Sequence, residues 1–240
     1  IIMENNHYGV QSSIEGRNQF FMKVYGWMFG GIAISAAVAY LFSTNHALFR
    51  LFYNFMVATH GYGMLGIFLL QLVLVFLMRP DYEKLGNPIR YMVMYCLYAA
   101  LTGLTFFSVT FVYDLGSIVQ AFASTCALFV GLSVVGFTTK KDLTGWGQQA
   151  LGALLGLIIA ITLNLVFFRS SMVEWIMSGI SLIIFIILTI YDTQKLKRMY
   201  DYFEGQSALE GIAILGALEL YLDFINIFLD ILRLFGSSKD

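Results

Sequence analysis

Four acidic residues lie within otherwise apolar stretches toward the C-terminal end of this 240-residue chain. Asp192 closes one run of aliphatic residues, and Glu219, Asp223 and Asp230 interrupt the next one. A carboxylate placed in hydrocarbon costs about 2.5–3.5 kcal/mol on insertion scales, so each of these side chains needs a polar partner or water. Carboxylate oxygens bind hard cations such as Ca²⁺ and also take up protons. Cation binding and proton binding are therefore the chemistry that these residues offer.

The polar residues of the last apolar stretch follow the repeat of one helical face. Separated by steps of 4, 3, 4 and 3, they are Glu219, Asp223, Asn226, Asp230 and Arg233. Leu, Ile, Phe and Tyr occupy the opposite face, so the pattern predicts a membrane helix whose polar stripe lines a pathway. Asp223, near the middle, is the strongest candidate for a function. For Asp230 and Arg233, a structural ion pair near the membrane surface is at least as good an explanation as a role in the pathway.

Composition indicates the class of protein that holds these acids. Hydrophobic residues make up 59% of the chain and charged residues 12%, about half the charged share of an ordinary globular protein. The apolar content excludes a disordered chain, and a net charge of −1 offers no basic surface for nucleic acid. We therefore predict an all-α, multi-pass protein of the cell membrane, whose partner is the lipid bilayer.

Seven stretches are long and apolar enough to cross a bilayer, which takes about 20 residues per helix. They lie at about 21–42, 62–78, 90–112, 117–138, 148–168, 173–191 and 212–235. The runs are continuous, whereas transmembrane β-strands would alternate over about 10 residues. The sequence therefore predicts a seven-helix transmembrane domain at 21–236, with an N-terminal tail at 1–20 and a C-terminal tail at 237–240.

The distribution of Lys and Arg predicts a cytoplasmic N-terminus, because cytoplasmic loops carry an excess of these residues. With that orientation, the outer loops hold only Arg50 and Arg169. The cytoplasmic side then holds Arg17, Lys23, Arg79, Lys84, Arg90, Lys140, Lys141, Lys195, Lys197 and Arg198. Seven spans place the C-terminus outside.

Three segments resemble the signature of the Bax inhibitor-1 (transmembrane Bax inhibitor motif) family. They are IYDTQ at 190–194, LYLDFIN at 220–226 and GFTTKKDLT at 136–144. The LYLDFIN run, which precedes Phe235-Gly236, is the most specific of the three. The resemblance covers nearly the whole chain from the first span onward, and the short tails are similar to those of bacterial members.

The resemblance implies a fold in which the last of seven helices is enclosed by the other six. It also implies a pH-sensitive calcium leak controlled by two aspartates, which match Asp192 and Asp223 here, and an arginine bonded to them, which matches Arg79. Arg79 alternatively serves as a positive anchor at the cytoplasmic end of the second span. Glu219 and Asp230 stand where several relatives have neutral polar residues, which predicts a more acidic pathway.

Such a pair of aspartates has a definite chemistry. Two carboxylates held close together cannot both ionise cheaply, so they share a proton and titrate as a coupled pair. When ionised, Asp192 and Asp223 present oxygen ligands to a passing Ca²⁺ ion. When protonated, the pair forms a hydrogen bond that ties two helices shut. One site would then sense pH and bind the transported ion, with no resident cofactor.

Four other functions compete with this one. A proton-coupled cation transporter or antiporter also uses buried acids. An intramembrane aspartyl protease needs Gly-x-Gly-Asp at its second aspartate, whereas bulky Leu220, Tyr221 and Leu222 precede Asp223 here. A retinal protein needs a lysine in the last span, and 212–235 contains none. A protein-interaction role, which the family's cell-death name suggests, is compatible with channel and transporter alike. We predict a calcium leak channel rather than an enzyme.

Overall fold

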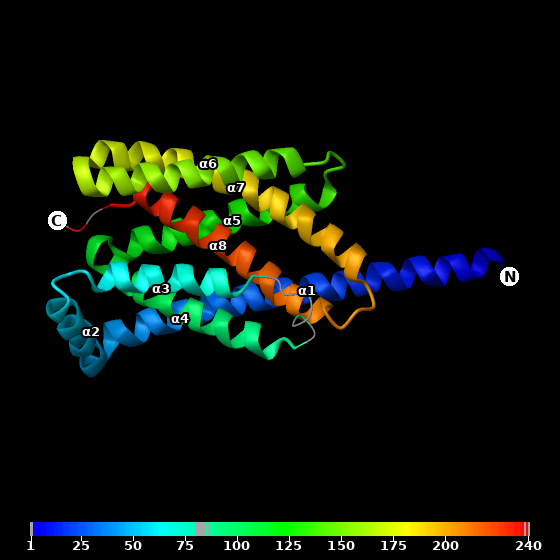
Figure 1. Cartoon of the computed structure of the whole chain (residues 1–240), viewed down its shortest axis with the longest axis horizontal. Helices are drawn as coiled ribbons and strands as arrows, with labels where there is room; N and C mark the ends of the chain where they lie inside the picture. The colour runs from blue at the N-terminus through cyan, green and yellow to red at the C-terminus, as the bar shows by residue number, and fades with distance from the viewer. Residues whose placement is uncertain (1, 80–84, 86, 238, 240) are drawn as a thin grey trace. The chain divides into compact units, whose positions relative to one another are not determined.

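The computed structural model describes residues 2–79, 85, 87–237 and 239, with side chains from residue 15 onward apart from residue 165. Nearly all of these residues are helical, and the described part of the chain contains no β-strand (Figure 1). The elements are α1 (Ile2–Thr44), α2 (His46–Ala58), α3 (Gly63–Leu77), α4 (Ile89–Val112), α5 (Leu115–Thr138), α6 (Thr144–Leu163), the π-helical turn η1 (Asn164–Phe168), α7 (Ser171–Phe203) and α8 (Leu209–Phe235). The predicted all-α class is confirmed.

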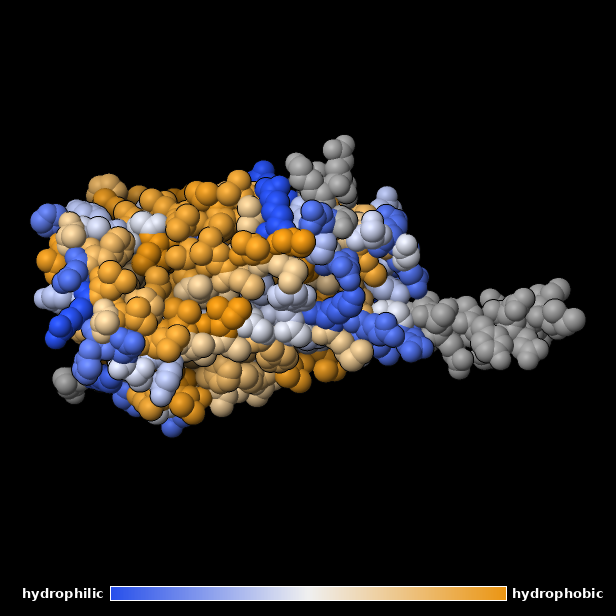
Figure 2. All heavy atoms as spheres, turned by 90° about the horizontal axis from the view of Figure 1, so that it is seen from below, coloured by the Kyte–Doolittle hydropathy of each residue, from blue (hydrophilic) through white to orange (hydrophobic). Residues whose placement is uncertain are grey.

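Six helices are long and apolar enough to cross a membrane, and each contains or overlaps a predicted span. They are Glu15–Thr44 within α1, then α4, α5, α6 continued through η1, α7 and α8. The predicted span at 62–78 corresponds to α3, whose 15 residues rise only about 22 Å, less than the roughly 30 Å of hydrocarbon. Helix α3 qualifies only together with α2, to which it is bent by 99°, so the count is six, or seven if this pair is one span. Hydrophobic side chains make up much of the face shown in Figure 2, as a protein surrounded by lipid requires.

Helix α2 lies between the first two predicted spans, in the segment 43–61 where an outer loop is expected. Asn45 begins this helix, because its Oδ1 accepts hydrogen bonds from the amides of Ala47 and Leu48 at 2.9 and 3.3 Å. None of the residues of α2 is buried. The chain then turns through His60 and Gly61, which have positive φ angles of 51° and 86°. This turn bends α3 away from α2.

Helix α7 extends well beyond the predicted end of the sixth span at 191. The segment from Lys195 onward, expected as a link between spans, remains helical to Phe203. No Gly or Pro interrupts 192–204, and Gly205, with a φ of 77°, is the first residue suited to a helix end. The predicted N-terminal tail at 1–20 is likewise helical from residue 2. The extension of α7 places polar residues on a helix directly after Asp192.

The chain forms two compact units, Ile1–Val109 with Met199–Leu218 and Thr110–Arg198 with Glu219–Asp240. In the first unit, the Ser35 hydroxyl of α1 donates to the Ala99 carbonyl oxygen of α4 at 2.8 Å. The Gln71 amide of α3 donates to the Thr102 hydroxyl of α4 at 3.0 Å. Gly103 permits the close approach of α1 and α4, because a Cβ there would lie 2.7 Å from the Ser35 carbonyl oxygen. These contacts pack α1 and α3 on α4.

In the second unit, two glycines bring neighbouring helices against α7 beside Asp192. A Cβ on Gly136 of α5 would lie 2.7 Å from the carbonyl oxygen of Ile190. A Cβ on Gly147 of α6 would collide with the ring of Tyr191. Helices α5 and α6 therefore fix the position of α7 next to its acidic residue.

Two other glycine pairs also have the four-residue spacing that is typical of close helix approach. The pairs are Gly26/Gly30 and Gly152/Gly156. A Cβ added at any of them would meet no described atom within 4 Å. Spacing alone does not show which glycine faces a neighbouring helix.

Helix α8 is the most buried of the candidate spans. Within its most apolar stretch 78% of the residues are buried, against 12–33% in the other five. Phe224 of α8 packs edge-on against Phe122 and Phe129 of α5, with ring centroids 5.7 and 5.6 Å apart. This burial agrees with an interior position for α8. That six helices enclose it remains a prediction.

Candidate functional site

Three of the carboxylates singled out from the sequence come together in the second compact unit. Asp192 lies on α7, and Glu219 and Asp223 lie on α8. Asp223 is 3% exposed, and the side chain of Asp192 is 13% exposed. Both Asp192 and Glu219 interact electrostatically with Asp223. We refer to Asp192, Glu219 and Asp223 as the acid cluster.

Asp223 keeps spare capacity to accept a hydrogen bond. One partner of its carboxylate is the Thr189 hydroxyl, which also lies 2.7 Å from the Phe185 carbonyl oxygen of its own helix. A hydroxyl has one proton, so Thr189 can donate to only one of these acceptors at a time. The Oδ2 atom of Asp223 is buried and has no hydrogen-bond partner among the described residues. Such a carboxylate is suited to take up a proton or a cation.

Lys195 supplies the positive charge next to the acid cluster. Its Nζ donates to Oε1 of Glu219 at 2.6 Å and lies 4.0 Å from Oδ1 of Asp192. The other oxygen of Glu219, Oε2, is buried and lacks a partner within the described chain. The apolar pattern ends the sixth predicted span at 191, so the sequence does not single out Lys195 as a site residue. Its spacing of three from Asp192 would have put both on one face, had the helix been extended that far.

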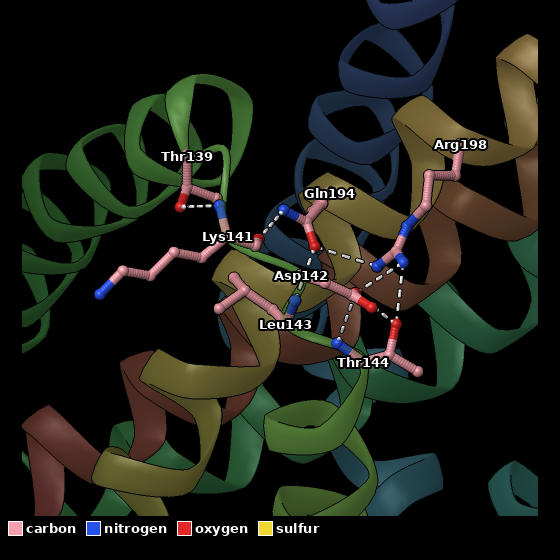
Figure 3. Close-up of polar contacts among 7 residues, drawn as sticks. All are labelled: Thr139, Lys141, Asp142, Leu143, Thr144, Gln194 and Arg198. Atoms are coloured by element: carbon pink, nitrogen blue, oxygen red, sulfur yellow. Dashed lines mark hydrogen bonds and ion pairs between the residues drawn. The ribbon is translucent and has the colours of Figure 1, made fainter.

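Two residues beyond Asp192 on α7, Gln194 ties this helix to the connection between α5 and α6 (Figure 3). Its Nε2 donates to the Lys141 carbonyl oxygen at 2.8 Å, and its Oε1 accepts from the Leu143 amide at 3.0 Å. Gln194 is 9% exposed. The Gln194 side chain therefore provides hydrogen-bond partners for two backbone groups of the α5–α6 connection.

Arg198 joins the same connection one turn later (Figure 3). Its Nη1 donates to Oδ1 of Asp142 at 2.9 Å and to the Thr144 hydroxyl at 2.8 Å, and its Nη2 donates to Oε1 of Gln194 at 3.0 Å. Hydrogen bonds from the Thr144 hydroxyl and amide, and then from Arg198, hold the pKa of Asp142 below its usual value of 3.8. We refer to Gln194, Arg198, Asp142 and Thr144 as the loop clamp.

The loop clamp explains why two of the sequence segments noted above belong together. The segment at 136–144 supplies Asp142 and Thr144, and the segment at 190–194 supplies both Asp192 and Gln194. The hydrogen bonds of Gln194 join these segments in space. The clamp was missed from the sequence because its partners lie more than 50 residues apart.

Asp230 forms a separate polar site further along α8. It is 4% exposed and interacts with the Ser181 hydroxyl of α7. Arg233 lies one turn away, with Nη1 3.9 Å from Oδ1 of Asp230 and 2.9 Å from the Ser178 hydroxyl. The structural ion pair of Asp230 with Arg233 is therefore present, although the distance between the charged atoms is long for an ion pair. Oδ2 of Asp230 has no partner in the part of the chain that the structure describes.

Asn226 lies between these two sites and is bonded to its own helix. Its Nδ2 donates to the Leu222 carbonyl oxygen at 2.7 Å. Beyond it, a cavity of about 380 Å³ is lined by Ser117, Gln120 and Ser124 of α5 and by Ile231 and Phe235 of α8, among others. Polar groups therefore continue past Asp223, from Asn226 on α8 to the polar side chains of α5 that line the cavity.

Arg79 belongs to the first compact unit. It is exposed, and its guanidinium lies over the Phe76 ring, 5.0 Å from the ring centroid. Lys84, which is predicted to lie on the cytoplasmic side, falls outside the described residues, as do Pro80 and Asp81. A bond from Arg79 to the aspartates remains a prediction.

The described residues contain no group of three or more His, Cys, Asp or Glu side chains arranged to hold a metal ion. A Ca²⁺ ion at Asp192 and Asp223 would thus have few protein ligands, whereas stable Ca²⁺ sites use 6–8 oxygens.

Comparison with known proteins gives a consistent result. Residues 17–240 match the family model described as "Inhibitor of apoptosis-promoting Bax1". The inner membrane protein YbhL of Escherichia coli K12 is 38% identical over 226 residues, which cover 93% of this chain and 94% of the relative. A protein of Deinococcus radiodurans is 39% identical over 96% of this chain and 95% of its own length. A membrane protein of Streptococcus pyogenes serotype M3 is 35% identical over 98% of this chain and 99% of its own length.

Proposed function

The chain belongs to the Bax inhibitor-1 family of membrane proteins, and from this membership and the acid cluster we propose that it is a pH-sensitive calcium leak channel. The observation that carries the proposal is Asp223, a carboxylate 3% exposed within an apolar helix, which interacts with Asp192 and Glu219. An apolar helix retains such a costly group where ions or protons pass. The proposal assigns the protein no enzymatic activity.

In this proposal, Asp192 and Asp223 share a proton when the channel is closed. The hydrogen bond between them joins α7 to α8. Loss of the proton leaves two negative charges that repel each other and attract a cation. Because the two carboxylates offer few ligands, Ca²⁺ is held weakly enough to leave again. Arg79 takes the role of a bonding partner that favours the ionised pair.

The proposed location is the cytoplasmic membrane, with the N-terminus inside. The excess of Lys and Arg on one side of the predicted spans supports this orientation. The relative YbhL is an inner membrane protein by name. The polar residues from Glu219 to Asp230 on α8 then form the pathway between the two surfaces.

A proton-coupled cation transporter is the second candidate, because the same acids suit it. Purified protein in liposomes that contain a Ca²⁺ indicator distinguishes the two functions. A leak lets Ca²⁺ move only down its own gradient, at a rate that depends on pH. A coupled transporter moves Ca²⁺ against its gradient when a proton gradient is applied. Absence of Ca²⁺ flux at every pH tested, with flux of another cation, would refute the calcium leak.

A further inference from the structure

Lys195 is the cation that the acid cluster holds in this structure. Its Nζ lies 2.6 Å from Oε1 of Glu219 and 4.0 Å from Oδ1 of Asp192. It therefore bridges α7 and α8 at the point where the proposed function requires a passing cation. The side chains of Lys195 and Glu219 are 33% and 36% exposed, so water reaches this end of the cluster.

When all three carboxylates of the cluster are ionised, Lys195 alone does not balance their charge. Three ionised carboxylates and one ammonium leave an excess of two negative charges, since −3 and +1 give −2. Two carboxylate oxygens, Oε2 of Glu219 and Oδ2 of Asp223, are buried without a partner among the described residues. The cluster thus has both charge and ligand atoms in reserve for a divalent cation.

We propose that Lys195 is a tethered counter-cation, and that a divalent cation enters the acid cluster only by displacing its ammonium from Glu219. This inference rests on the proposed function for its role in ion passage. Both cations seek the same oxygen atoms, so they compete. Lys195 would keep Glu219 neutralised when no divalent cation is present and set the concentration at which the site fills.

The loop clamp makes such a displacement a movement of the side chain alone. Gln194 and Arg198 flank Lys195 and fasten its helix to the α5–α6 connection through Lys141, Leu143 and Asp142 (Figure 3). The backbone of α7 is therefore held on both sides of Lys195. The four-carbon stem of lysine is flexible, so the ammonium group can move out toward solvent. In this proposal, Lys195 competes with the divalent cation for the carboxylate oxygens of the acid cluster.

Ca²⁺ binding to the purified full-length protein in detergent, measured by equilibrium dialysis at one fixed alkaline pH, tests the competition. Lys195→Gln should bind Ca²⁺ more tightly by about tenfold or more, because the competing charge is gone. Lys195→Arg keeps the charge and should bind no more tightly than the wild type. Lys197→Gln is the matched control, since Lys197 lies on the same helix and makes no ion pair with a described residue. It should leave the affinity unchanged.

The wild-type protein provides a second measurement that does not depend on a variant folding. Ca²⁺ should raise the reaction of Lys195 with an amine-reactive reagent, read by mass spectrometry, and leave that of Lys197 unchanged. Equal or weaker Ca²⁺ binding by Lys195→Gln, no binding in any variant, or no change in labelling would each overturn the inference. Tighter binding by Lys195→Gln together with no Ca²⁺ flux in liposomes would support the role of Lys195 and refute the leak.

Discussion

Replacing Gln194 with alanine should release the α5–α6 connection from α7 without removing any carboxylate of the acid cluster. Gln194 makes two hydrogen bonds to backbone atoms of the connection and one to Arg198. A neutral hydrogen bond contributes about 0.5–1.5 kcal/mol net, so the two backbone bonds together contribute about 1–3 kcal/mol. The Arg198 side chain is 45% exposed and keeps Asp142, so its bond to Gln194 adds little.

Two measurements on the purified protein in detergent detect the loss of these hydrogen bonds. The thermal midpoint of unfolding should fall, and trypsin should cleave faster after Lys140 and Lys141 in the released connection. Every 1.4 kcal/mol corresponds to about a tenfold larger open population, so a loss of about 1–3 kcal/mol should accelerate cleavage by about 5-fold to 100-fold. Gln194→Glu should have a smaller effect. It keeps an oxygen for Leu143 and loses only the donor to Lys141.

Gln206→Ala is the control for this experiment. Gln206 is an exposed glutamine whose Nε2 donates to the Tyr202 carbonyl oxygen at 3.3 Å, outside the clamp. Its replacement should change neither the melting temperature nor the cleavage rate appreciably. Equal behaviour of Gln194→Ala and Gln206→Ala would refute the clamp. A lower melting temperature with unchanged cleavage would mean that Gln194 supports the fold without holding the connection.

Four further predictions concern the pathway and its surroundings. Asp192→Asn and Asp223→Asn should each flatten the pH dependence of Ca²⁺ flux, and the double variant should be little worse than either one; strictly additive effects would mean that the two residues do not interact. Arg79→Lys should raise the pH midpoint of the flux and Arg79→Ala should raise it further, because the guanidinium fork favours the ionised pair; unchanged midpoints would leave Arg79 as an anchor of its span. A cysteine in place of exposed Ser237, with the other cysteines removed, should react with an impermeant reagent outside oriented cells, and protection until permeabilisation would contradict the outside C-terminus. The lowered pKa of Asp142 means that its clamp bonds stabilise the fold at pH values above its usual 3.8 and lose this effect as the pH falls through the lowered pKa. Asp142→Asn should therefore weaken the acid-side fall of the melting temperature, and an unchanged fall would show that Asp142 does not contribute to it.

The membrane class and most of the spans follow from the sequence because lipid offers no hydrogen bonds to the backbone. An apolar run of about 20 residues must therefore be helical. The same solvent makes carboxylates costly, so Asp192 and Asp223 stand out by their position in apolar runs alone. The sequence did not reveal the bend between α2 and α3, because it depends on the positive φ angles of His60 and Gly61 rather than on hydropathy.

Only the tertiary structure decided which positive charge lies next to the acids. Lys and Gln form helices as readily as they occupy loops, so the residues after Asp192 do not show where α7 ends. Lys195 lies 24 residues from Glu219, and the two meet because α7 remains helical past Asp192. The rotation of α7 is set by Gly136 and Gly147, which admit Ile190 and Tyr191 at close range. Side-chain packing between helices remote in sequence determines these lengths and rotations, and no local pattern of residue types encodes them.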